Sequence, residues 1–112
     1  MSRIGFDEMQ RLQTELQERY KNMWAPCVPA EGRVKLLWMM IEAGEAADVI
    51  KKEGDDAILH DPGARARFTE ELCDVLMYLN DVMICYGITP EETESAYIAK
   101  HETNMHRWKT EE

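Results

Sequence analysis

Apolar side chains recur at helical spacing in four segments of the chain, and no stretch alternates with the period of two that marks a half-buried strand. Helices are expected over roughly residues 6–24, 33–53, 62–86 and 90–108. Pro26 and Pro29 separate the first two helices because proline cannot continue a helix. A polar connection over residues 53–63 separates the second and third helices. The pattern therefore predicts an all-α fold.

Capping residues mark where the two later helices begin. Asp61 is placed to cap a helix whose first residue is Pro62, and Gly87 is placed to end it. Thr89 and Glu92 form a capping box around Pro90. No linker is long enough to divide the chain, so we expect one domain over residues 1–112.

The second helix is apolar around much of its circumference. Its widest apolar face is expected to belong to the core and comprises Leu36, Met39, Met40, Ala43, Ala46, Ala47 and Ile50. A single chain of four helices cannot easily cover so broad a surface, so the pattern predicts an oligomer.

The charge balance excludes two classes of partner. A net charge of -9 argues against binding to nucleic acid or to an anionic membrane surface, because phosphate contacts require clustered Lys and Arg.

There is no apolar signal core and no run approaching the roughly 18 apolar residues of a membrane span. Cys27, Cys73 and Cys85 form an odd set without a C-x-x-C spacing, which indicates neither a disulfide framework nor a zinc site. We expect a cytoplasmic protein.

Two helices each carry a pair of acidic residues beside an apolar surface. Glu42 and Glu45 are three residues apart in the second helix, and Glu71 and Asp74 repeat this spacing in the third. If both faces turn inward, four carboxylates converge and repel one another unless cations neutralise them. A set of oxygen ligands without His or Cys suits Mg²⁺, with Mn²⁺ as a substitute. This chemistry indicates phosphoryl or nucleotidyl transfer.

Two other interpretations of the acidic pairs exist. Taken alone, a pair of acidic residues on a helix is more often a solvated face. A di-iron bundle requires Glu-x-x-His motifs, and His60, His101 and His106 all lack a Glu three residues earlier.

The last predicted helix offers groups that suit phosphate. Tyr97, Lys100, Asn104 and Arg107 follow one another at intervals of three, four and three residues and therefore share a face. Two cations and an amide donor could hold phosphate oxygens, and a solvated face is the alternative.

Residues in the first two helices could contact a nucleobase. Gln13 lies among apolar neighbours, where its amide needs either a nucleobase edge or a hydrogen bond within the core. Trp24 and Trp38 could stack on a base, although such rings more often pack in a core or an interface.

The order and separation of Glu42-x-x-Glu45 and Glu71-x-x-Asp74 resemble the MazG-like all-α nucleoside triphosphate pyrophosphohydrolases, a superfamily that includes dimeric dUTPases and dCTP pyrophosphatases. The Lys100, Asn104 and Arg107 run looks like an element that follows the acidic helices in several members. The resemblance implies a four-helix MazG-like bundle completed by oligomerisation into a homodimer or homotetramer.

The resemblance also implies Mg²⁺-dependent hydrolysis of a nucleoside triphosphate between its α and β phosphates, in a housecleaning or nucleotide-pool role. The implied metal ligands are Glu42, Glu45, Glu71 and Asp74, and Glu45 or Glu42 would activate the water. The implied phosphate-binding residues are Lys100, Asn104, Arg107 and Lys52. Nucleotide-binding candidates are Gln13, Trp24, Trp38, Tyr78, Tyr97 and Asp81, the last standing near a position where some members carry Asn.

Two alternative functions stay open. One is a noncatalytic helical interaction module that keeps the acidic residues as a solvated face. The other is an enzyme of the phosphoribosyl-ATP pyrophosphohydrolase type.

Overall fold

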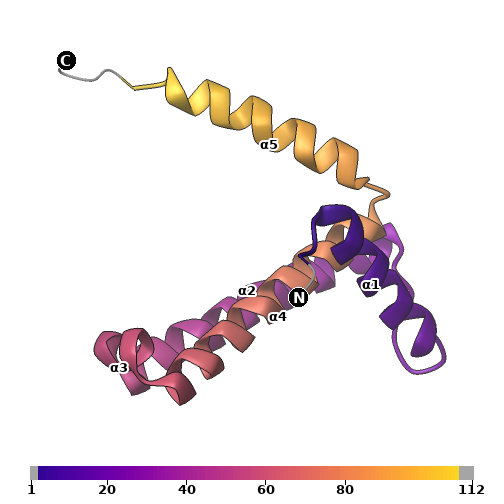
Figure 1. Cartoon of the computed structure of the whole chain (residues 1–112). Coiled ribbons are helices and arrows are strands. Elements are labelled where there is room, and N and C mark those ends of the chain that lie inside the picture. The colour runs from indigo at the N-terminus through magenta and orange to yellow at the C-terminus, as the bar shows by residue number, and fades with distance from the viewer. Residues whose placement is uncertain (1–2, 109–112) are drawn as a thin grey trace.

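The computed structural model describes residues 3–108, and every regular element in that range is a helix (Figure 1). The helices are α1 (Phe6–Arg19), α2 (Pro29–Glu53), α3 (Asp55–His60), α4 (Pro62–Cys85) and α5 (Pro90–Met105). The predicted all-α fold is confirmed. The fifth helix is the short α3, which lies in the segment expected to be an irregular connection.

The predicted caps of the two later helices are confirmed. The Asp61 carboxylate accepts a hydrogen bond from the Ala64 backbone N–H at 2.9 Å, and Pro62 is the first residue of α4. The Glu92 backbone N–H donates to Thr89 Oγ1 at 3.1 Å, and the Glu92 carboxylate accepts in return from the Thr89 backbone. Local hydrogen-bonding chemistry therefore fixes where α4 and α5 begin.

Three helix ends differ from the prediction. The first helix stops at Arg19 rather than Trp24, and the chain continues as turns. Pro29 starts α2 four residues earlier than expected, because the first turn of a helix tolerates a residue without an N–H. At the other end of the chain α5 stops at Met105, so Arg107 lies beyond the helix.

The body of the molecule is an antiparallel pair formed by α2 and α4, here called the hairpin. These two helices lie side by side along most of their length, with α3 closing one end and α1 packed against α4 at the other (Figure 1). Ala46 of α2 is only 5% exposed, and its small side chain permits close approach of the two helices.

The last helix, α5, leaves this body. It turns by 112° relative to α4, packs against α1, and extends away from the hairpin (Figure 1). The radius of gyration is 17.0 Å, whereas a compact chain of this length has about 13 Å. The described chain therefore does not close into a four-helix bundle by itself.

Within residues 3–108 no single helix is long and apolar enough to cross a membrane. The helices α4 and α5 meet that requirement only jointly, across their bend.

The expected core face of α2 is largely uncovered. Leu36, Met40 and Ile50 are 43%, 63% and 42% exposed, and Ala46 is the buried member of that face. The expectation that this face as a whole belongs to the core of the chain is wrong. The helix turns the side bearing Glu42 toward α4, whereas Trp38 meets the edge of Tyr78 and is 51% exposed. Periodicity identifies an apolar face without identifying the element that covers it.

Candidate metal centre

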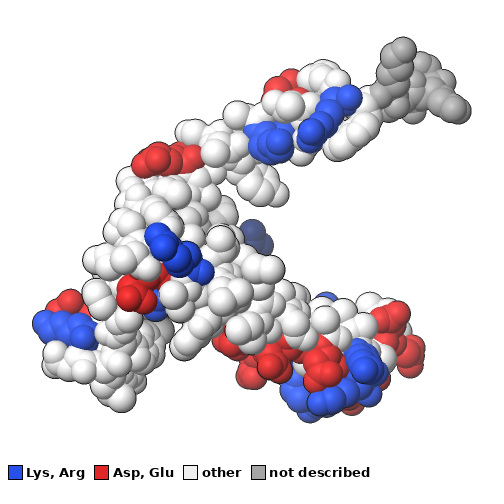
Figure 2. All heavy atoms as spheres, turned by 180° about the vertical axis from the view of Figure 1, so that it is seen from behind, with Lys and Arg blue, Asp and Glu red and all other residues white. Residues whose placement is uncertain are grey.

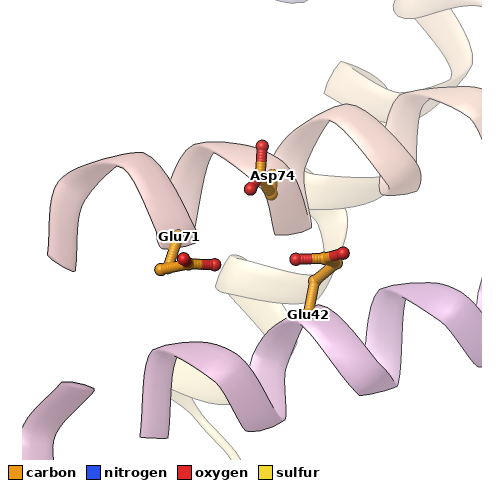
Figure 3. Close-up of side chains that lie close together, drawn as sticks. All are labelled: Glu42, Glu71 and Asp74. Carbon is orange, nitrogen blue, oxygen red and sulfur yellow. The ribbon is translucent and has the colours of Figure 1, made fainter. Parts of the chain in front are cut away.

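Three carboxylates from the two helices of the hairpin meet between them and are here called the acidic triad. Glu42 comes from α2, and Glu71 and Asp74 come from α4 (Figure 3). Each offers an oxygen, and these oxygens lie within 4.8 Å of one another. The three-residue spacing places Glu71 and Asp74 on the same side of α4, which faces α2. The predicted convergence of these three side chains is thus present.

The fourth predicted ligand, Glu45, lies outside the triad. It follows Glu42 on α2, its side chain is exposed, and it is not among the oxygens that meet within 4.8 Å. Its negative charge nevertheless contributes to raising the pKa of Glu71. Glu45 is therefore close to the centre without belonging to it.

The carboxylates of this region form no ion pair with a cation of the described residues. Among residues 3–108, no Lys, Arg or His forms an ion pair with Glu42, Glu45, Glu71 or Asp74. The pKa of Glu71 is raised, first by desolvation and then by the negative charges of Asp74, Glu42, Glu45 and Glu70. A bound cation would relieve this repulsion.

The donor set fits a hard divalent cation. All three groups are carboxylates, their side chains are half-buried, and no His or Cys is among them. Mg²⁺ is commonly bound by a small number of carboxylates, with water and substrate phosphates completing its coordination. The triad could therefore hold a metal ion.

A cavity of about 490 Å³ adjoins the triad, because Asp74 lines its wall. Three aromatic side chains, Trp24, Trp38 and Tyr78, line it as well. Trp38 and Tyr78 meet edge to face with their centroids 6.1 Å apart. This volume lies within the range typical of small-molecule sites.

A buried carboxylate forms the polar side of the cavity. Asp81 is 4% exposed and accepts a hydrogen bond from Gln17 Nε2 at 3.0 Å, with Lys35 Nζ at 3.8 Å. Burial raises the pKa of Asp81, while hydrogen bonds from Gln13 and Gln17 and the charge of Lys35 oppose that rise. Gln13, 6% exposed, therefore has a partner within the core and lines the cavity at the same time.

Trp24 lies among the turns that follow α1, where it also lines the cavity. Its ring stacks on Tyr20 with centroids 4.7 Å apart, and the residue is 39% exposed. One face of the ring is thus supported by the protein, and the side chain reaches both solvent and cavity.

The predicted phosphate-binding residues do not lie at the triad. Lys100 and Asn104 are on α5, which packs against neither helix of the hairpin along its length. Arg107 follows α5 and places its guanidinium carbon 5.4 Å from the centroid of the Trp108 ring. Lys52 is exposed and pairs with Asp48 at 2.8 Å. Tyr97 is 70% exposed on α5 and, like the four cationic and amide residues above, does not line the cavity.

Sequence reasoning missed several residues that line the cavity, including the polar Gln17, Glu31 and Lys35. Lys35 and Gln17 had a readable signal. Lys35 precedes Trp38 by three residues and Glu42 by seven, and Gln17 follows Gln13 by four, so each shares a helix face with a residue already selected.

Comparison with known protein families, with curated proteins and with solved structures returns no match to this chain.

Proposed function

We propose that this protein is a Mg²⁺-dependent nucleoside triphosphate pyrophosphohydrolase. The observation that carries the proposal is a triad of carboxylates, without an ion pair to any cation in residues 3–108, beside a cavity lined by aromatic rings and amides. A nucleoside triphosphate needs both features, because its phosphates bind cations and its base fills an apolar slot. The resemblance of the two acidic motifs to MazG-like enzymes supports the same reaction.

The proposed reaction assigns separate roles to the acidic residues. Glu42, Glu71 and Asp74 hold Mg²⁺, which neutralises phosphate charge and positions the substrate when it is bound. Glu45 lies beside the triad but outside it, so its carboxylate is free to orient the attacking water and accept its proton. Glu42 is the alternative for this role.

The products follow from attack at the α phosphorus. The water oxygen forms a bond to that phosphorus, the bond to the bridging oxygen breaks, and pyrophosphate leaves with the electron pair. The remaining product is the nucleoside monophosphate. Such a reaction suits nucleotide-pool control or housecleaning.

The cavity is the proposed nucleoside site. Trp24, Trp38 and Tyr78 supply ring surfaces for a base, and the amides of Gln13 and Gln17 beside Asp81 supply hydrogen-bonding groups. Asp74 borders both the cavity and the triad, so a nucleotide placed there has its phosphates near the metal ligands.

The four-helix bundle is proposed to form from more than one copy, as a homodimer or a homotetramer. The apolar face of α2 and the isolated position of α5 support this assembly.

A substrate screen tests the proposed reaction. The purified chain is incubated with Mg²⁺ and a panel of canonical, deoxy and modified nucleoside triphosphates and phosphoribosyl-ATP, and pyrophosphate and monophosphate are measured. We expect both products in equal amounts, with activity lost in Glu45→Gln and Asp74→Asn. Glu70→Gln is the matched control, because it removes a neighbouring charge outside the triad.

Each contrary outcome has a defined meaning. No pyrophosphate from any substrate, or unchanged rates in both variants, would contradict the proposal and favour a noncatalytic module. Orthophosphate as the first product would mean attack at the γ phosphate. A strong preference for phosphoribosyl-ATP over free nucleotides would favour an enzyme of the phosphoribosyl-ATP pyrophosphohydrolase type.

A further inference from the structure

The end of the hairpin opposite α3 brings together two cysteines that are 58 residues apart in the sequence. Cys27 lies in the connection between α1 and α2, and Cys85 is the last residue of α4. Both are free thiols, with Cys27 half-buried and Cys85 4% exposed. They are here called the thiol pair.

The packing of α1 against α4 determines where this connection starts. Gln17 Nε2 donates to Asp81 Oδ1 at 3.0 Å, and Gln10 Nε2 donates to the Ile88 carbonyl at 2.8 Å. The two helices are therefore antiparallel, and α1 ends beside the turn of α4 that precedes Asp81. To reach the start of α2, the chain must return along α4 toward Cys85.

The start of α2 lies beside the end of α4. A Cβ atom placed on Gly32 would lie 2.3 Å from Cε2 of Tyr86, so the glycine lets the α2 backbone rest on that ring. One turn further along α2, Lys35 Nζ lies 3.8 Å from Asp81 Oδ2. The connection that carries Cys27 thus runs between contacts that lie on either side of Cys85 along α4.

The environment of the thiol pair disfavours a thiolate. Burial raises the pKa of Cys27 to about 12, helped by a hydrogen bond with Cys85 and by the charge of Asp81, while Lys35 opposes the rise. Figure 2 shows Lys and Arg crowded with Asp and Glu near the α3 end of the hairpin, and fewer charged side chains at the opposite end of the face it draws. Because the thiolate is the reactive form, oxidation of this pair should be slow.

We propose that the thiol pair is a redox modification site, at which Cys27 and Cys85 form a disulfide that links the α1–α2 connection to the end of α4. Oxidised glutathione is a sufficient oxidant. The sulfur of Cys27, the more accessible of the two, attacks one glutathione sulfur and releases one glutathione thiolate. The sulfur of Cys85 then attacks Cys27 in the mixed disulfide and releases the second glutathione. The pair loses two protons and two electrons, and one glutathione disulfide becomes two glutathione thiols.

The bond would join two parts of the cavity wall. Trp24 and Ala25 line the cavity and precede Cys27 by three and two residues, and Asp81 lines it one turn before Cys85. The disulfide therefore restrains the segment that bears the Trp24 ring. Since the reduced pair holds no stabilised thiolate, the disulfide is favoured at equilibrium although it forms slowly. This site does not depend on which ligand occupies the cavity.

Peptide mapping tests for the bond directly. Cys73 and Cys85 share the tryptic peptide of residues 68–100, so the Cys73→Ser variant is used, which removes the exposed third cysteine. The reduced protein is kept at pH 8 with oxidised glutathione until its mass no longer changes. We expect residues 22–33 linked to residues 68–100, with no glutathione retained, and separation of the two peptides in dithiothreitol. Free thiols, retained glutathione or a bond between two chains would overturn the inference.

Thermal unfolding tests whether the bond fits the native structure. Linking residues 58 positions apart restricts the unfolded chain, so oxidised Cys73→Ser should melt roughly 10 °C or more above its reduced form. The double variant Cys27→Ser/Cys73→Ser keeps Cys85 as its single thiol and should show no such gain. An equal or lower Tm after oxidation would mean that the bond distorts the fold, and would overturn the inference.

Amide hydrogen exchange tests the effect on the cavity wall. Exchange over residues 22–28 should be slower in the oxidised than in the reduced Cys73→Ser protein, because the bond suppresses local opening of that segment. The helix α5 lies outside the linked segment and is the internal control. Equal exchange over residues 22–28 in both forms would contradict the proposed restraint on Trp24.

Discussion

Removing one carboxylate of the triad should stabilise the metal-free protein. Asp74→Asn deletes a negative charge whose oxygen lies within 4.8 Å of a Glu42 oxygen, while the side-chain volume stays nearly the same. Two unit charges at that distance repel by about 1 kcal/mol in a water-like dielectric and by more in a half-buried site. We therefore expect the free energy of unfolding in EDTA to rise by about 1 kcal/mol, which raises Tm by about 4 °C or more.

In the presence of Mg²⁺ the wild type should be more stable than Asp74→Asn. At a concentration ten times its Kd, a ligand that binds only the folded state adds about 1.4 kcal/mol to the free energy of unfolding. The wild type should gain this stabilisation, whereas Asp74→Asn should gain little because one of three ligands is lost. The wild type then melts above the variant in MgCl₂ and below it in EDTA.

The assay is thermal unfolding followed by circular dichroism at one fixed protein concentration, since assembly makes Tm depend on concentration. Glu70→Gln is the control and should keep the Mg²⁺ response, because Glu70 lies outside the triad. A lower Tm for Asp74→Asn in EDTA, or an equal Mg²⁺ shift in both proteins, would refute the reasoning.

Three further predictions concern other groups. The pKa of Glu71 is raised above its ordinary value of 4.5, so near that pH the folded state binds more protons than the unfolded state. The stability of the metal-free protein should therefore fall as the pH rises from 4.5, and the dependence of Tm on pH should be weaker in Glu71→Gln. Burial raises the pKa of Cys27 to about 12, so in the native protein at pH 8 mass spectrometry should find Cys27 resistant to iodoacetamide, unlike in the urea-unfolded chain. Thr89→Ala removes the capping box and should cost about 1 kcal/mol in urea unfolding, whereas Thr89→Ser should cost less.

Features fixed by neighbouring residues could be predicted from the sequence. The caps at Asp61 and Thr89 depend on hydrogen bonds within one helical turn, and both appear as expected. The acidic triad follows from a three-residue spacing on two helices that turn these faces toward each other. Glu45 was predicted as a fourth ligand and lies outside the triad. Its position depends on which side of α2 faces α4, and residue spacing alone does not determine that.

Features fixed by distant packing could not be predicted. Periodicity marked Leu36 and Met40 as apolar but did not reveal that α4 covers the side of α2 bearing Glu42 and the small Ala46. The helical spacing of Lys100 and Arg107 likewise said nothing of the bend that carries α5 away from the hairpin. Both depend on which surfaces meet, and in our account the missing surface belongs to a second copy.

Isotope tracing tests the central claim most directly. Hydrolysis of the best substrate from the screen is carried out in ¹⁸O-labelled water with Mg²⁺, and the products are analysed by mass spectrometry. Water activated beside the triad and directed at the α phosphorus places one ¹⁸O atom in the nucleoside monophosphate and none in pyrophosphate. Label in pyrophosphate or orthophosphate, or product formation that persists unchanged in EDTA, would contradict the account.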